Sequence, residues 1–330
     1  MNANGRMRRG LFLGALAALL SPAAVQGQPP KAARVGVLAS SSEANFAPSI
    51  KVFREALHAV GWVEGQNLTL EIRYAGEQYA RLPELAVELV NLKVDVLTSL
   101  GSPATQAAKR ATTTIPIVME SLADAVATGL VPNLARPGGN LTGVSGFAPE
   151  LSGKRLELVR ELLPSARRVA VLANRANPAT GSVLRAAEAA ADHMRLQLQI
   201  VDVRQPAELS AAFDTIKGGH NDALVLVADP LLFSQMRRII ELAAEHRLPT
   251  MYETRLFPEA GGLLSYGPLA RERFQRMAVY VDRILRGARP GDLPVEQAST
   301  FELVLNLRTA KSLRLDVPPK LRLRADHVIE

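Results

Sequence analysis

The side chains best suited to acid–base chemistry in this chain are Asp229 and Glu253, each placed directly after a short apolar run. Two carboxyl groups that converge from separate elements could serve a hydrolase or lyase, or could equally hold an ammonium group. The five histidines show no metal-ligand spacing, and Gly143–Gly146 is one residue short of a G-x-S-x-G elbow. No P-loop or G-x-G-x-x-G motif follows a predicted strand. The sequence therefore favours binding over catalysis, and no catalytic residue, metal ion or cofactor is expected.

A candidate anion site lies in the stretch from Val94 to Glu120. The apolar run Val94–Leu97 predicts a strand, which Gly101 and the following residues end. Ser102 is a suitable N-cap for a helix over Ala104–Arg110, and Ile115–Met119 predicts the next strand. In a parallel βαβ unit this turn lies at the carboxyl edge of the sheet, where a helix start favours a carboxylate. An ordinary turn with a capping serine fits the same residues. The candidate ligand-binding residues here are Gly101, Ser102, Ala104 and Thr105.

Three further groups of polar residues come shortly after predicted strands in the first half of the chain. Ser41 and Ser42 follow the first strand, and their hydroxyl groups could bind a ligand or form a flexible turn. Tyr79 follows the second strand and could cover a ligand or simply pack. Asp124 follows the fourth and could face the ligand, although helix capping is the favoured interpretation. All of these would meet at one sheet edge if the strands are parallel.

Apolar runs and amphipathic segments alternate twice along the chain. This alternation predicts an α/β fold with two doubly wound parallel-sheet lobes joined by a hinge. The other predicted strands are Arg34–Leu38, Leu68–Tyr74, Leu141–Val144, Val169–Leu172, Leu196–Val203, Ala223–Val227, Pro249–Tyr252, Gly262–Ser265, Phe301–Leu305 and the short final element Ala325–Ile329. The other predicted helices are Pro48–Val60, Leu82–Leu92, Ala125–Leu134, Ser152–Leu163, Thr180–Met194, Leu209–Ile216, Leu231–His246, Leu269–Leu285 and Leu307–Leu313.

In the second half of the chain, polar residues again lie at the carboxyl ends of predicted strands. Asn174 and Asn177 follow one predicted strand and Asp229 a second, while Tyr252 ends a third and Glu253 follows it. Hydroxyl and N–H donors on one lobe and carboxylates on the other match a zwitterion. We therefore expect the carboxylate of a small solute to bind the first lobe and its amine to bind Asp229 or Glu253, with the hinge closing around it.

The domain boundaries follow from where the alternation begins and stops. The chain continues beyond the second lobe, so it is expected to return to the first lobe and to cross a third time. The expected division is a leader over residues 1–27, a first lobe over 28–145 plus about 267–297, and a second lobe over 146–266 plus about 298–330.

The first residues have the form of a secretory signal. Arg6, Arg8 and Arg9 precede the apolar stretch Leu11–Leu20, which is too short to span a bilayer, and a small polar segment follows. The pair Arg8 and Arg9 also resembles a twin-arginine signal. Losing the three arginines with the leader lowers the net charge from +7 to +4. The remaining charges are scattered among acids, so nucleic-acid binding is not expected, and cysteine is absent, which excludes disulfides.

Several stretches resemble one known family. They are Gly61–Asn67, Thr112–Val118, Asn133–Ser145, Lys154–Leu158, Gly261–Gly267 and Arg324–Asp326. Over nearly its whole length the chain resembles the ABC-transporter substrate-binding proteins related to the tryptophan- and tyrosine-binding proteins, within the type I periplasmic binding proteins. The resemblance implies a periplasmic receptor that hands a small solute, such as an amino acid or aromatic acid, to a membrane permease and ATPase. A monomer is expected. A periplasmic sensor subunit with the same fold is the alternative, beside the hydrolase or lyase using Asp229 and Glu253.

Overall fold

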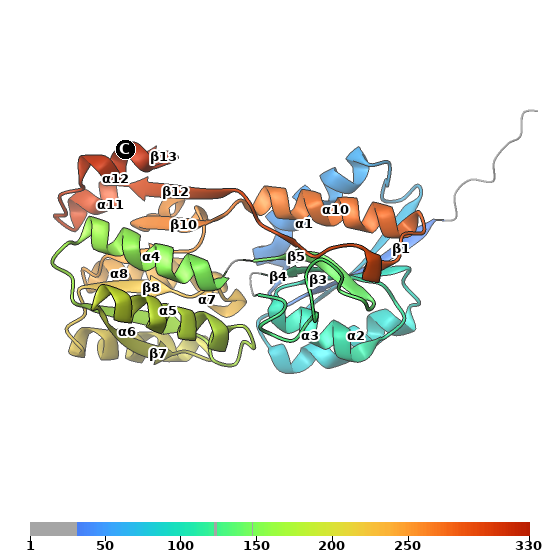
Figure 1. The fold of residues 1–330 in the computed structure, drawn as a ribbon, viewed down its shortest axis with the longest axis horizontal. Coiled ribbons are helices and arrows are strands. Elements are labelled where there is room, and N and C mark those ends of the chain that lie inside the picture. Colours follow the sequence, from blue (N-terminus) through green and yellow to red (C-terminus); the bar gives the residue numbers. More distant parts are fainter. Residues whose placement is uncertain (1–31, 122–123, 147) are drawn as a thin grey trace, which may run out of the picture. The chain divides into compact units, whose positions relative to one another are not determined.

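The protein is described here by a computed structural model that covers residues 32–121, 124–146 and 148–330. Residues 32–330 form one compact unit. The predicted signal segment, residues 1–27, lies outside the described residues. Two sheets carry the structure, and both are mostly parallel with helices on each face (Figure 1). The predicted α/β fold is confirmed.

The first sheet has six strands in the order β11-β5-β4-β3-β1-β2, and all its neighbouring pairs are parallel. Its interior strands β3, β4 and β5 are buried along their whole length because both faces of the sheet are covered. The strands are β1 Ala33–Ala39, β2 Leu68–Tyr74, β3 Val96–Leu100, β4 Ile117–Ser121, β5 Leu141–Ser145 and β11 Glu296–Gln297.

Helices cover both faces of this sheet (Figure 1). One face packs against α1 Glu43–Ala59 and α10 Ala270–Leu285, where Val35 and Val37 meet Phe53 and Met277. The opposite face packs against α2 Leu82–Asn91 and α3 Ser102–Ala111. Phe53 is fully buried, and burying one such side chain contributes about 1.5–3 kcal/mol to folding.

The second sheet has seven strands in the order β13-β12-β10-β9-β8-β6-β7. All pairs are parallel except β10 with β12, which run antiparallel. The strands are β6 Arg168–Ala173, β7 Gln197–Asp202, β8 Ala223–Leu226, β9 Thr250–Tyr252, β10 Leu264–Pro268, β12 Phe301–Asn306 and β13 His327–Ile329.

Two apolar layers enclose the second sheet. Leu172 and Leu226 pack on one face with residues of α6 to α9, whereas Val169 and Val225 pack on the other with residues of α4, α5, α11 and α12. The helices are α4 Ala148–Leu162, α5 Thr180–Met194, α6 Leu209–Gly218, α7 Pro230–Ser234, α8 Met236–Glu245, α9 Leu256–Glu259, α11 Leu307–Ser312 and α12 Pro319–Arg324, with single 3₁₀ turns at η1 Tyr79–Arg81, η2 Pro206–Glu208 and η3 Pro290–Asp292.

The chain passes between the two sheets three times. It leaves the first sheet after β5 and completes β6 to β10 in the second. Helix α10 then packs on α1, β4 and β5 of the first sheet, and β11 pairs with β5. Finally β12 and β13 join the second sheet.

Three predicted helices differ from the structure. Over Ala125–Leu134 the chain forms turns, because Gly129 is left-handed (φ +68°) and Leu130 N–H returns to Ala125 O at 2.8 Å. The segment predicted as one helix, Leu231–His246, is divided at Gln235, where φ is −96° and ψ is 17°. Helix α1 starts five residues before the predicted start at Pro48, which lies inside it.

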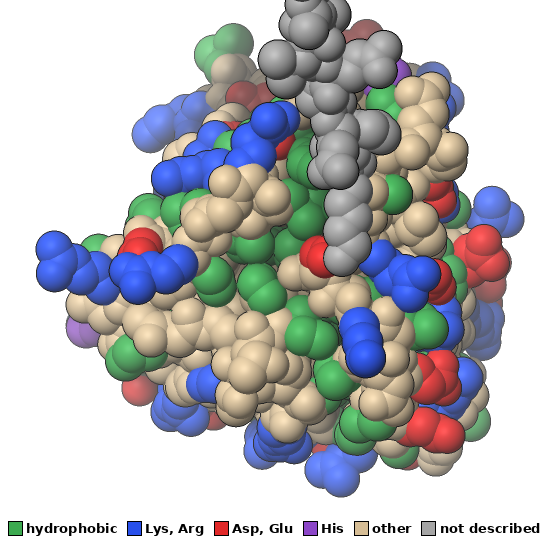
Figure 2. All heavy atoms as spheres, turned by 90° about the vertical axis from the view of Figure 1, so that its right-hand side faces the viewer, with side chains coloured by type: hydrophobic (Ala, Val, Ile, Leu, Met, Phe, Trp, Pro, Cys, Tyr) green, Lys and Arg blue, Asp and Glu red, His purple; other side chains and the backbone are tan. Residues whose placement is uncertain are grey.

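Charged side chains are mixed on the surface shown in Figure 2, where Lys and Arg lie among acidic and uncharged residues. This mixture fits a role of the charge in solubility. None of the helices in residues 32–121, 124–146 and 148–330 has the length and apolar character needed to cross a membrane.

Candidate functional site

The carboxyl edge of the first sheet brings together serines from different strands. The register places Leu100 beside both Ala39 and Glu120, and Ser121 beside Ser145. The residues that follow β1 and β3 therefore leave at the same edge. Ser102 Oγ lies 2.7 Å from Ser121 Oγ, and both side chains are buried.

The start of α3 is built differently from the prediction. Gly101, with φ +92°, is the N-cap, and Ser102 is the first helical residue. The cap hydroxyl comes from Ser40, which accepts from Ala104 N–H at 3.1 Å and donates to Leu100 O at 3.0 Å. A Cβ atom on Gly101 would lie 2.8 Å from this same hydroxyl, so the position requires glycine. The prediction of Ser102 as N-cap is wrong, since Ser40, 62 residues earlier, supplies the oxygen.

Ala104 and Thr105 are completely buried at this edge. The Thr105 hydroxyl donates to Gly101 O at 3.0 Å and lies 2.9 Å from Ser99 Oγ. Thr105 therefore holds the turn together within the protein.

A second polar cluster surrounds Glu77, which has left-handed backbone geometry with φ +63°. The Ser41 hydroxyl donates to Glu77 Oε1, which also accepts from Ser42 N–H at 3.1 Å and from Asn45 Nδ2 at 2.9 Å. Ser41 is buried, whereas Ser42 is half-buried. Sequence reasoning identified the two serines but missed the acid that binds them.

The prediction that Asp124 caps a helix is wrong, because the segment after it forms turns, and Asp124 caps a turn instead. Its Oδ1 atom accepts from Val126 N–H at 2.8 Å and from Ala127 N–H at 3.0 Å. It thereby satisfies donors of the turn that replaces the predicted helix.

Asp229 follows β8 at the carboxyl edge of the second sheet. It caps α7, and Oδ1 accepts from Leu231 and Leu232 N–H at 2.9 and 3.2 Å. Asn174 Nδ2 donates to Oδ1 at 3.2 Å, and Asn177 Nδ2 donates to Oδ2 at 2.9 Å. Burial raises the pKa of Asp229, although these hydrogen bonds oppose the shift.

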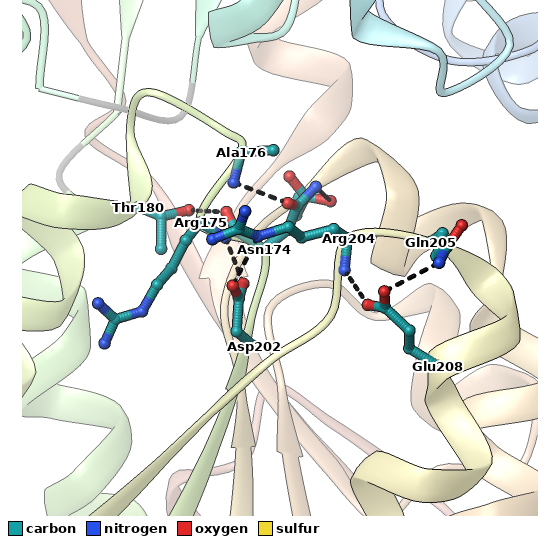
Figure 3. Close-up of polar contacts among 9 residues, drawn as sticks. Asn174, Arg175, Ala176, Thr180, Asp202, Arg204, Gln205 and Glu208 are labelled. Atoms are coloured by element: carbon teal, nitrogen blue, oxygen red, sulfur yellow. Dashed lines mark hydrogen bonds and ion pairs between the residues drawn. The ribbon is translucent and has the colours of Figure 1, made fainter.

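The two asparagines also shape their own loop, as Figure 3 shows for Asn174. Asn174 Oδ1 accepts from Ala176 N–H at 2.9 Å, and its backbone carbonyl accepts from Thr180 Oγ1 at 2.6 Å. Arg175 N–H donates to Asp202 at the end of β7 at 2.8 Å. Each asparagine thus uses its oxygen for the local turn and its amide nitrogen for Asp229.

Tyr79 connects the two sets of residues. It follows β2 in the first sheet, and its hydroxyl donates to Asp229 Oδ2 at 3.0 Å. Burial and the charge of Asp229 raise the pKa of Tyr79, so the phenol stays protonated and acts as a donor. A Cβ atom on Gly101 would also lie 3.5 Å from Pro230, the first residue of α7. The segments that leave the carboxyl edges of the two sheets therefore meet at Tyr79, Asp229, Gly101 and Pro230.

Tyr252 ends β9 and Glu253 follows it, and the two side chains differ in their surroundings. The Tyr252 ring is buried and stacks on Phe257 with centroids 4.5 Å apart. Glu253 is buried as well, and burial raises its pKa to about 8 despite the nearby positive charge of Arg155. Among the described residues, no donor reaches Glu253 Oε2.

Sequence reasoning missed two arginines, of which Arg155 is buried and Arg273 is largely buried. Arg155 donates from Nε to Tyr266 O at 2.8 Å, and burial lowers its pKa. Its only signal was its place in one of the family-like stretches, Lys154–Leu158. Arg273 of α10 forms an ion pair with Glu120 at the end of β4, and burial lowers the arginine pKa to about 10. No local sequence pattern predicts an ion pair between residues that are 153 positions apart.

Two further observations concern regions other than the carboxyl edges of the sheets. A hollow of about 350 Å³ lies between α4 and α5 and is lined by Glu157, Arg160, Glu161 and Met194. Within the described part of the chain, His, Asp and Glu side chains form no group of three that could hold a metal ion.

Comparison with known proteins places this geometry in context. A family model described as ABC transporter substrate binding protein matches residues 34–329. The tyrosine-binding protein of Clostridioides difficile (strain R20291) is 27% identical over 278 residues, which are 84% of this chain and 78% of that protein.

Two solved structures are similar over most of the chain. A conserved domain protein from Vibrio cholerae has a TM-score of 0.86 and 27% identity, covering 90% of this chain and 100% of that one. The ABC domain from Streptococcus pneumonia in complex with L-Trp has a TM-score of 0.84 and 23% identity, covering 90% and 99%.

Proposed function

The chain belongs to the ABC transporter substrate binding protein family, and on this premise we propose that it binds a small solute for import. The solute would bind between the two lobes, which close around it by a hinge movement. The protein would then present it to a membrane permease and ATPase. Export of a monomer to the periplasm by the arginine-containing signal, Sec or twin-arginine in type, belongs to the same proposal.

One observation carries this proposal: the carboxyl edges of both sheets supply polar residues that reach one another, through the Tyr79 hydroxyl and Asp229. Ligands of open α/β sheets bind at such edges. The lobe boundaries proposed from the sequence fit the strand pairing, since β11 pairs with β5 whereas β12 pairs with β10.

We propose an amino acid, with an aromatic side chain, as the solute class. The support is the name of the relative from Clostridioides difficile and the L-Trp complex of the structural neighbour. The solute carboxylate would bind the first edge and the amine would bind Asp229 or Glu253. The proposed contacts are Ser41, Ser42, Tyr79, Gly101, Ser102, Ala104, Thr105, Asp124, Asn174, Asn177, Asp229, Tyr252 and Glu253.

The geometry favours binding over hydrolysis. A hydrolase using Asp229 and Glu253 needs both carboxyl groups available to a reacting molecule. Protein donors occupy both oxygen atoms of Asp229. We therefore propose that the protein is not an enzyme.

The test is a thermal unfolding series with the twenty common amino acids and their deamino analogues. A ligand at one hundred times its dissociation constant stabilises the native state by about 2.7 kcal/mol. At least one amino acid should raise the melting temperature by several degrees. No shift with any of them contradicts the proposal. A sensor subunit would bind the same solute, and reconstituted import with a permease and ATPase distinguishes the two functions.

A further inference from the structure

Two buried acids follow neighbouring strands at the second edge, and their carboxylates have different partners. β8 and β9 are parallel, with Val225 beside Met251, so the residues after them leave at the same edge. Asp229 is 3% exposed and Glu253 is 6% exposed. Burial alone therefore does not decide which of them contacts a solute.

Asp229 has no acceptor position left for a further donor. Oδ1 accepts from Asn174 and from the N–H groups of Leu231 and Leu232, and Oδ2 accepts from Tyr79 and Asn177. A carboxylate offers about four lone-pair sites, and these five donors already exceed that number. An ammonium group could bind here only by displacing one of them.

Glu253 presents the opposite situation. Its Oε2 atom is buried and receives no hydrogen bond from the described residues. A buried acceptor without a donor is costly, and such atoms in native structures call for an explanation. The charged groups that face Glu253 are Arg155 from α4 and Asp229 at the start of α7. The Nε atom of Arg155 is committed to Tyr266 O, and Asp229 repels a second negative charge.

We infer that Glu253, and not Asp229, receives the ammonium group of the solute, while Asp229 positions Tyr79 and the asparagine loop. This inference rests on the proposed function. An ammonium group would supply the missing donor to Oε2 and compensate the carboxylate charge. The solute class narrows accordingly to small molecules that carry a protonated amine.

The inference links binding to protonation. Burial raises the pKa of Glu253 to about 8, so at neutral pH the free protein holds a proton that the ammonium group must displace. Affinity for an amine should therefore rise about tenfold per pH unit from pH 6 towards 8 and then level off. A solute without the amine should not show this rise.

The experiment compares two ligands on matched variants. Calorimetric titration of wild-type protein with the twenty common amino acids identifies the tightest binder, which is then compared with its deamino analogue. We expect Glu253→Gln to lower affinity for the amino acid by about 10- to 100-fold and to leave the analogue nearly unchanged. Asp229→Asn should weaken both ligands alike, because it disturbs the shared scaffold. Glu241→Gln, at an exposed position on α8, is the neutral control.

The outcomes separate the two proposals. Equal affinities of wild-type and Glu253→Gln protein for the amino acid, or equal losses for amino acid and analogue, overturn the inference alone. Failure of every amino acid to bind wild-type protein contradicts the proposed function. Should Glu253→Gln not fold, titration of wild-type protein at pH 7 in phosphate and in Tris decides the question. Release of close to one proton supports the inference, and no release overturns it.

Discussion

The hydroxyl group of Tyr79 donates to Asp229 Oδ2 at 3.0 Å and joins residues 150 positions apart. Tyr79 follows a strand of the first sheet, whereas Asp229 follows a strand of the second. A hydrogen bond from a protonated phenol to a carboxylate is stronger than one between neutral groups, and this bond is partly buried. This bond therefore directly links the segments that leave the carboxyl edges of the two sheets.

Tyr79→Phe should weaken this link without changing the shape of the ring. We expect a loss of about 1.5 kcal/mol in the free energy of unfolding, since a hydrogen bond to a charged group is removed. Small-angle scattering should also show a larger radius of gyration of the free protein, because the lobes separate more readily. Urea denaturation measures the first effect. Tyr74→Phe, at the half-buried end of β2, is the matched control. Identical behaviour of the two variants contradicts the role of Tyr79.

The Glu120–Arg273 pair should show strong coupling. Arg273→Met leaves the Glu120 carboxylate buried without its ion-pair partner, which costs about 3–5 kcal/mol. The double variant Glu120→Gln/Arg273→Met should lose much less, because no unpaired charge remains. A double-mutant cycle from denaturation curves measures the coupling. Additive losses would show that the two residues act independently.

Gly267→Ala should displace Glu253. A Cβ atom at Gly267 would lie 1.8 Å from the backbone oxygen of Glu253, so the backbone must shift. We expect a loss of about 1–3 kcal/mol in stability, together with weaker solute binding. Gly218→Ala, at the end of α6 with open space around it, should be neutral or stabilising. Normal stability and binding of the Gly267 variant would contradict the packing described.

Glu253 should make stability depend on pH. Its pKa rises from 4.5 to about 8 on folding, so the native state holds a proton that the unfolded state has lost. The corresponding stability is fully present below about pH 4.5 and is lost as pH rises towards 8, at up to about 1.4 kcal/mol per pH unit. Glu253→Gln should remove this slope. Urea denaturation at pH 5, 6.5 and 8 measures the difference between the two proteins. A difference that stays constant with pH contradicts the assignment.

The sequence predicts most of the fold because the strands and helices leave local signals. The run Leu68–Tyr74 and the helix Thr180–Met194 have the predicted bounds. Buried parallel strands are mostly rich in apolar residues, and their helices are amphipathic. The error at Ala125–Leu134 had a signal too, since Gly129 and Pro132 both oppose a helix there.

The candidate site is harder to predict, because its contacts are made between distant residues. Asp229, Asn174 and Asn177 were all predicted as ligand contacts, yet they hydrogen-bond to one another. Ser40 is the cap of a helix that begins 62 positions later, and Arg273 pairs with Glu120 across 153 positions. Residue type and strand order predict which side chains gather at an edge. They do not predict which of them remain available to a ligand.

Calorimetric titration of the purified protein with L-tryptophan and L-tyrosine tests the central claim most directly. We expect saturable binding of at least one of them at one site per chain, weakened by Glu253→Gln and unaffected by Glu241→Gln. The absence of binding heat and of thermal stabilisation with both, in a folded protein, would contradict the claim that the two sheet edges hold an aromatic amino acid.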